Sequence, residues 1–120
     1  VIVSSATAKS DILPASQTRD RQRRIAIASG LAASAVSLAK SGNVGAVVLT
    51  GGETAAAFLK QVRVQGVKLD AEILPGIALG TVVGGPVDGL RVVTKAGGFG
   101  LPGSLTRVMR YLGRRLSRGM

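Results

Sequence analysis

Two glycine-rich turns carry most of the chemistry that this sequence could perform. The first is Thr50-Gly51-Gly52-Glu53-Thr54, which lies between an apolar run and a helical pattern. Where a buried strand ends and a helix begins, unpaired backbone N–H groups and the helix dipole attract anions, and glycine has no Cβ to keep a phosphate away. The turn therefore predicts a phosphate site formed by Gly51, Gly52, Glu53 and Thr54. A tight turn with a purely structural role is a comparably weighted alternative.

Glu53 makes the nature of that site more specific. The turn has neither the Gly-Lys-Ser/Thr ending of a Walker A loop nor the G-x-G-x-x-G pattern. A carboxylate in the first turn of a helix stabilises the helix dipole, but beside a triphosphate it would repel unless a cation lay between them. If a phosphate binds here, we expect Glu53 to hold Mg²⁺, a metal-bound water or a ribose hydroxyl. Otherwise it serves the helix dipole alone.

The second turn is Lys95-Ala96-Gly97-Gly98-Phe99-Gly100, directly after the β-branched run Val92-Val93-Thr94. Three glycines in four positions indicate a close approach to the backbone, here at Gly97 and Gly98, or several residues with positive φ. Phe99 could cover an adenine ring, although a plug for the nearby core is favoured two to one. Lys95 could neutralise a phosphate, but a solvated lysine is the commoner case.

The net charge and the placement of the arginines bear on whether the protein binds nucleic acid. The formal net charge of +10 attracts phosphates of any kind, and arginines gather in two places: Arg19, Arg21, Arg23 and Arg24, then Arg107, Arg110, Arg114 and Arg118. A nucleic-acid footprint is one interpretation, but with Tyr111 the only aromatic among the terminal arginines a solvated helix face is favoured.

The absence of two residue types also excludes several kinds of site. There is no Cys or His, which excludes disulfides and thiolate zinc sites and indicates an intracellular, cytoplasmic protein. The longest uncharged runs, Ile25–Ala39 and Ile73–Val87, have 15 residues each, fewer than a bilayer-spanning helix needs. We therefore expect no membrane partner.

The elements that position these turns can be predicted from periodicity. Continuous apolar runs predict strands at 1–3, 45–50, 67–73, 77–83 and 90–94, and helical spacing predicts helices at 20–40, from Thr54, and from Ser104. On the last helix the expected apolar face consists of Leu105, Val108, Met109, Leu112 and Leu116. We predict an α/β fold in one domain, 1–120, with a three-layer-like sheet of about five strands, partly parallel, flanked by about three helices.

With both turns in this order, the sequence resembles the C-terminal nucleotide-binding domain of the four-carbon acid sugar kinase family, formerly a domain of unknown function. The resemblance rests on four stretches of this sequence. They are Val1-Ile2-Val3-Ser4-Ser5, Thr50-Gly51-Gly52-Glu53-Thr54-Ala55, Glu72-Ile73-Leu74-Pro75-Gly76 and Val93-Thr94-Lys95-Ala96-Gly97-Gly98-Phe99-Gly100. The matching stretches cover the chain up to the terminal helix.

The resemblance implies a kinase that moves the terminal phosphoryl group of ATP to a hydroxyl of a threonate, erythronate or oxo-tetronate. It places ATP contacts at Gly51, Gly52, Glu53, Thr54 and Gly97. We add Gly98 as a neighbouring contact and, from the charge argument above, Mg²⁺ at Glu53. It leaves the catalytic residues unknown. It also implies an N-terminal domain of the same protein that binds the acid sugar, and it is compatible with a homo-oligomer.

Several features depart from the family pattern. Ala96 stands where the family often has Ser, and the stretch 101–104 lacks an acidic residue common there. The N-terminal domain and an upstream Gly-Ser stretch that also touches ATP are absent from this sequence. We therefore expect this part of the protein to be inactive alone. A basic nucleic-acid-binding domain and a non-catalytic interaction domain are the alternatives.

Overall fold

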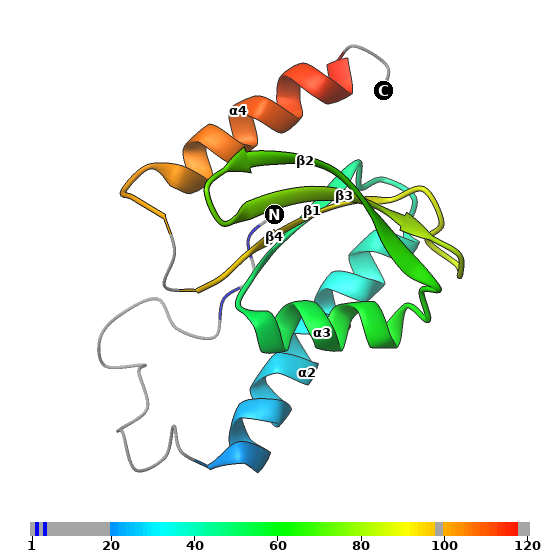
Figure 1. Cartoon of the computed structure of the whole chain (residues 1–120). Coiled ribbons are helices and arrows are strands. Elements are labelled where there is room, and N and C mark those ends of the chain that lie inside the picture. Colours follow the sequence, from blue (N-terminus) through cyan, green and yellow to red (C-terminus); the bar gives the residue numbers. More distant parts are fainter. Residues whose placement is uncertain (1, 3, 5–19, 98–99, 118–120) are drawn as a thin grey trace.

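The chain folds around one mixed four-stranded sheet (Figure 1). The computed structural model describes residues 2, 4, 20–97 and 100–117, with side chains as far as residue 115. Along the chain the elements are α2 (Arg21–Lys40), β1 (Ala46–Thr50), α3 (Gly52–Gln61), β2 (Gly66–Leu74), β3 (Ile77–Val83), β4 (Arg91–Lys95) and α4 (Ser104–Ser117). The strands lie in the order β1-β4-β3-β2.

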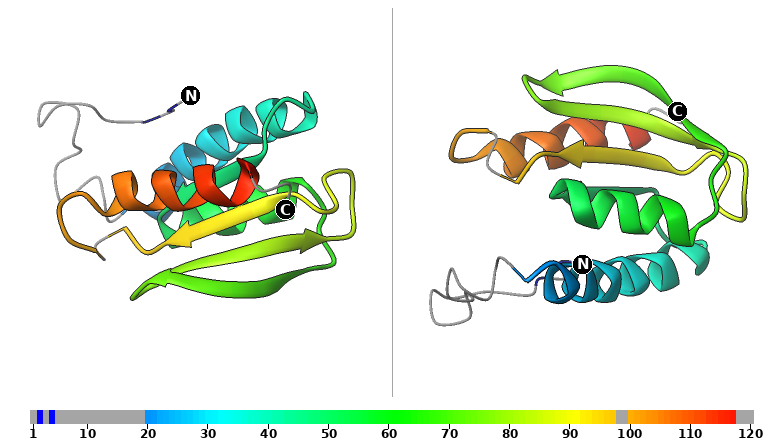
Figure 2. Two further views of the ribbon diagram at one scale, coloured as in Figure 1. Left: turned by 90° about the horizontal axis from the view of Figure 1, so that it is seen from above. Right: turned by 60° about the horizontal axis from the view of Figure 1, so that its bottom comes forward.

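The helices cover both faces of this sheet, which gives three layers (Figure 2). On one face, α2 and α3 pack in a cluster that includes Ala32, Phe58 and Val62 with Leu49 and Val92 of the sheet. On the other face, α4 packs through a second cluster whose buried members are Ile77, Leu79, Val93, Val108 and Leu112. The predicted α/β fold with a partly parallel sheet and three flanking helices is therefore confirmed.

The strand directions bring the two glycine-rich turns to one edge of the sheet. β1 pairs with β4 in parallel, with Thr50 opposite Lys95 at their carboxyl ends, while β3 runs antiparallel to both β4 and β2. The hairpin between β2 and β3 turns through Pro75 and Gly76, where Gly76 has a φ of +77°. The chain reverses here and again between β3 and β4, so that β4 runs parallel to β1 and ends beside it.

The structure differs from the sequence-based expectations in three places. The predicted strand at 1–3 is not seen: Ile2 lies outside any strand and is 94% exposed, and positions 1 and 3 lie outside the described residues. Helix α3 begins at Gly52, two residues before Thr54.

As for a membrane, no described helix is long and apolar enough to cross one.

The third difference concerns the predicted apolar face of the last helix, which only partly packs on the sheet. Val108 and Leu112 are buried, but Leu105 is 49% and Met109 60% exposed. The buried side chains of this helix are instead those of Ser104, Val108 and Leu112, which lie at 0°, 40° and 80° around its axis because an α-helix turns by 100° per residue. The apolar face of α4 is therefore wider than the part of it that packs on the sheet.

Candidate functional site

The turn after β1 presents unpaired backbone donors to solvent. Gly51 caps α3 with a φ of +97° and no side-chain hydrogen bond. Its N–H donates to the Lys95 carbonyl oxygen at 2.8 Å, and its own carbonyl accepts from the Ala55 N–H at 3.1 Å. Within the described residues, the N–H groups of Gly52, Glu53 and Thr54 have no protein acceptor, as expected for an uncapped first turn. These donors and the helix dipole attract an anion.

The two glycine-rich turns lie against each other at this edge. A Cβ built on Gly97 would lie 4.0 Å from the Gly51 Cα, and a Cβ built on Gly52 would meet no atom of the described residues within 4 Å. Two stretches of main chain therefore meet there, and no described residue fills the space in front of Gly52. Of the predicted site residues, the fold brings together Gly51, Gly52, Glu53, Thr54 and Gly97; Gly98 and Phe99 lie outside the described residues.

Glu53 is directed toward the neighbouring helix. Its Oε1 lies 3.5 Å from the Arg24 Nε of α2, and the two side chains are 57% and 43% exposed. An ion pair so accessible to water contributes little to stability, so the carboxylate can exchange this partner for another. Among the described residues no group of three or more Asp and Glu side chains could enclose a metal. A cation at Glu53 would need the ligand to supply most of its coordination.

Lys95 has a role that the sequence did not predict. Its Nζ donates to the carbonyl oxygens of Ala96 and Gly97, at 3.2 Å each. The half-buried side chain thus folds back over the turn that follows its own strand. These two local hydrogen bonds place the Lys95 ammonium over the start of the second turn.

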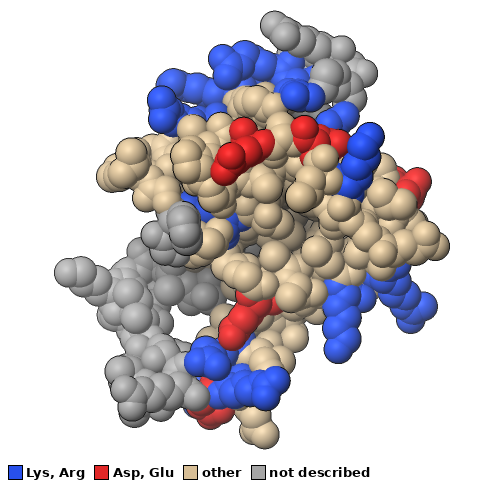
Figure 3. Space-filling view, in the orientation of Figure 1, with Lys and Arg blue, Asp and Glu red and all other residues tan. Residues whose placement is uncertain are grey.

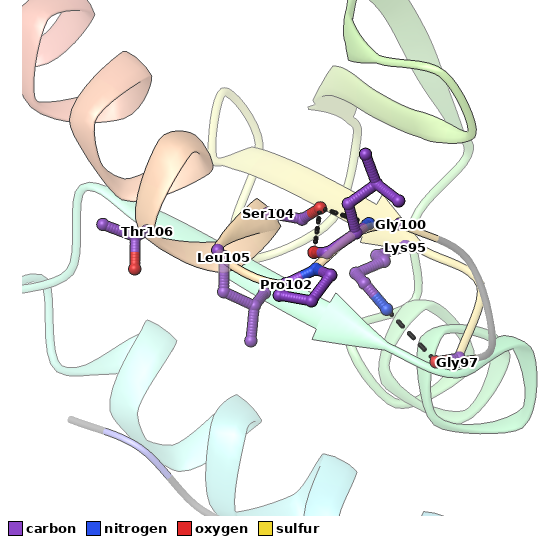
Figure 4. Close-up of a pocket in the computed structure, with 9 residues that line it drawn as sticks. Lys95, Gly97, Gly100, Pro102, Ser104, Leu105 and Thr106 are labelled. Carbon is purple, nitrogen blue, oxygen red and sulfur yellow. Dashed lines mark hydrogen bonds between the residues drawn. The ribbon is translucent and has the colours of Figure 1, made fainter.

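A hollow of about 370 Å³ opens beside this turn, between β4 and the start of α4 (Figure 4). It is lined by Lys95, Gly97, Gly100, Leu101, Pro102, Gly103, Ser104, Leu105 and Thr106. The buried Ser104 hydroxyl accepts from the Leu101 N–H at 2.9 Å and donates to the Leu101 carbonyl at 2.7 Å. The sequence analysis gave Ser104 only as the start of the last helix; Pro102-Gly103-Ser104 was the available signal for a shaped loop.

Comparison with known proteins identifies relatives of this chain. The sequence model of a family described as a nucleotide-binding C-terminal domain matches residues 1–105. A D-threonate kinase of Bordetella bronchiseptica is 45% identical over 69 residues, which are 58% of this chain and 17% of that protein. A D-threonate kinase of Salmonella typhimurium is 34% identical over 77 residues, 64% of this chain and 18% of that protein. The chain thus spans less than a fifth of either kinase.

Solved structures give the same result for the fold. A crystal structure of a domain of unknown function from Bordetella bronchiseptica, a domain-swapped dimer with bound citrate, covers 68% of this chain at a TM-score of 0.65 and 41% identity. A second crystal form of that dimer covers 70% at a TM-score of 0.66 and 40% identity. In both cases the matched part is 21% of the solved chain.

Proposed function

This chain belongs to the family of nucleotide-binding C-terminal domains, and from that premise we propose that it is the ATP-binding portion of a four-carbon acid sugar kinase. Its named relatives give it a kinase-related function. The proposed reaction transfers the terminal phosphoryl group of ATP to a hydroxyl of a threonate, erythronate or oxo-tetronate. The observation that carries the proposal is the contact between the two bare turns at Gly51 and Gly97.

The main chain does most of the proposed work. Phosphoryl transfer depends on positioning and on neutralising charge, and protein nucleophiles are not required. The free N–H groups of Gly52, Glu53 and Thr54 would donate to phosphate oxygens, and the α3 dipole would add to their attraction. Gly97 would let the nucleotide lie against the second turn, and the hollow beside it offers room for another part of the ligand.

Glu53 is the residue proposed to hold Mg²⁺. Mg²⁺ is commonly bound through one or two carboxylates together with substrate phosphates and waters, so a single carboxylate at the phosphate turn suits it. When bound, the ion would neutralise charge on the phosphates. Glu53 would leave its ion pair with Arg24 for this role.

The remaining parts of the reaction are proposed to lie elsewhere in a longer protein. The chain spans 17% and 18% of the two kinases. We therefore propose that an N-terminal domain of the same protein binds the acid sugar and supplies the base. The nucleotide-binding part described here would then be inactive alone. The solved relatives are domain-swapped dimers, which is compatible with a homo-oligomer here.

The test is calorimetry with Mg·ATP on the full-length protein and on its Gly52→Val variant. Because a Cβ at Gly52 meets no atom of the described part of the chain within 4 Å, the valine should leave folding intact while occupying the space in front of the free N–H groups. We expect the affinity for Mg·ATP to fall by at least about tenfold, the equivalent of about 1.4 kcal/mol.

Gly113→Val is the matched control, since Gly113 is also helical and equally open but lies on α4, away from the turns. Its affinity for Mg·ATP should equal that of the parent. Unchanged affinity in Gly52→Val would reject the site. Loss of Mg·ATP binding in both variants would show that the added valine disturbs folding and does not block the site directly.

A further inference from the structure

Arg24 lies at the edge where the first turn of α3 presents its N–H groups. Its Nε is 3.5 Å from Oε1 of Glu53, and Glu53 is the second residue of α3, directly after Gly52. The Arg24 guanidinium therefore lies beside the turn for which we proposed phosphate binding. The two side chains are 43% and 57% exposed, so each can reach a ligand from solvent.

The packing of α2 on α3 holds Arg24 in this place. The two helices lie side by side (Figure 2), and Ala32 of α2 is buried in the same cluster as Phe58 of α3. Gln61 Nε2 of α3 also donates to the Ser29 carbonyl oxygen of α2 at 3.2 Å. These contacts fix the backbone of Arg24 relative to the first turn of α3. Only the Arg24 side chain has to move for its guanidinium to change partners.

The charges around Arg24 run against the usual preference of helix ends. The first turn of α2 contains Arg21, Arg23 and Arg24 and no acidic residue, although the N-terminal end of a helix attracts anions and repels cations. The Asp20 carboxylate accepts from the Gln22 and Arg23 N–H groups and so serves the backbone of α2 itself. Figure 3 shows blue side chains gathered over the start of α2, with red ones against them. Such departures from local preference are expected at functional sites, and here an anion would supply the balancing charge.

On the basis of the proposed function, we infer that Arg24 is a further phosphate-binding residue of the nucleotide site. When Mg·ATP binds and Glu53 takes the metal ion, the Arg24 guanidinium turns from the Glu53 carboxylate to phosphate oxygens at the first turn of α3. Arginine suits this exchange of partners, because its planar fork matches the geometry of carboxylates and phosphates alike. Without nucleotide, the ion pair with Glu53 keeps the guanidinium at the site.

The test is calorimetry with Mg·ATP on the full-length protein and its variants, at about 150 mM salt so that distant charges are screened. Arg24→Gln should weaken binding by at least about tenfold, because a hydrogen bond between charged groups is lost. Arg24→Lys keeps the charge without the fork, so its loss should be smaller. Arg21→Gln is the matched control, since it removes the same charge from the same turn of α2 at an exposed position. It should change the affinity by less than about threefold.

A double variant separates a direct phosphate contact from an effect through Glu53. Mg·ATP forms in solution and can still reach the N–H groups of α3 in Glu53→Gln. If Arg24 binds phosphate itself, adding Arg24→Gln to Glu53→Gln should weaken Mg·ATP binding by about a further tenfold. If Arg24 only orients the Glu53 carboxylate, the double variant should bind as Glu53→Gln does, and that result would overturn the inference.

Failure of this inference can be told from failure of the proposed function. If Gly52→Val loses Mg·ATP binding while Arg24→Gln and Arg21→Gln bind alike, the nucleotide site stands and Arg24 is excluded from it. A parent protein that does not bind Mg·ATP would reject both. Because Arg24 is exposed, circular dichroism should show every variant folded. Should Arg24→Gln alone be misfolded, Arg24→Lys decides in its place, and an affinity equal to that of the parent would overturn the inference.

Discussion

At the scale of single residues, the glycines of this protein have two different uses. Gly52 and Gly97 keep side chains out of a space that none of the described residues fills, as expected where a ligand must approach the main chain. Gly85 instead lies against the protein's own backbone: a Cβ there would be 2.7 Å from the carbonyl oxygens of Val62 and Arg63. Substitution should therefore affect binding at the first kind and stability at the second.

We expect Gly85→Ala to lower the free energy of unfolding by roughly 2–4 kcal/mol, from the positive φ of +80° and the contact with two carbonyl groups. Urea denaturation measures this loss. Gly89→Ala is the control, because Gly89 has a φ of +85° but open space around its Cβ position. Its loss should be smaller, on the order of 1 kcal/mol. Equal losses would show that the carbonyl contact costs nothing.

At the scale of elements, the second turn is held at both of its ends. Lys95 at the end of β4 bonds the carbonyls of Ala96 and Gly97, and Ser104 at the start of α4 bonds both backbone groups of Leu101. Gly100, with a φ of +98°, lies against the Ser104 hydroxyl, so no larger residue fits there. Strand and helix together thus determine the shape of the hollow between them.

Ser104→Ala should destabilise the protein by roughly 1–2 kcal/mol, because the buried hydroxyl is the acceptor for the Leu101 N–H. The measurement is the midpoint of urea unfolding at constant m-value. Ser37→Ala, on the exposed side of α2, should change the free energy by less than about 0.5 kcal/mol. A Ser104→Ala protein as stable as its parent would mean that the turn does not depend on this hydroxyl.

At the scale of the whole molecule, a net charge of +10 raises the alternative of nucleic-acid binding. The proposed nucleotide site relies on main-chain N–H groups at one edge of the sheet, whereas the arginines of α4, including Arg107 and Arg110, are exposed on a different part of the surface. Figure 3 shows basic side chains over α4 at the top of the molecule, far from those near the start of α2. The two modes of binding should therefore respond differently to salt.

Between 50 and 200 mM salt, we expect the affinity for Mg·ATP to fall by less than about tenfold, since few counterions are released. A nucleic-acid site that neutralised six or more phosphates would lose roughly a thousandfold over the same range. Titration of Mg·ATP and of a single-stranded oligonucleotide at both concentrations measures this difference. A steep salt dependence for the oligonucleotide together with no Mg·ATP binding would favour the nucleic-acid alternative.

Much of the secondary structure was determined by the sequence itself. The strand 77–83 matches its prediction at both ends, and the helix predicted at 20–40 begins at Arg21 with Asp20 as its cap, whose side chain accepts from the Gln22 and Arg23 N–H groups. Apolar periodicity, capping residues and glycine positions are local properties, and local properties decide where helices and strands begin and end. The glycines of both turns were identified in the same way.

Only the tertiary structure decided how these elements meet. The pairing of β1 with β4 places Thr50 beside Lys95, the ion pair joins Glu53 to Arg24, and the narrow sheet leaves Leu105 and Met109 exposed. None of these contacts has a local signal, because each depends on strand order and on helix placement across distant parts of the chain. The edge where the two turns touch therefore arises from long-range pairing, which residue spacing alone cannot encode.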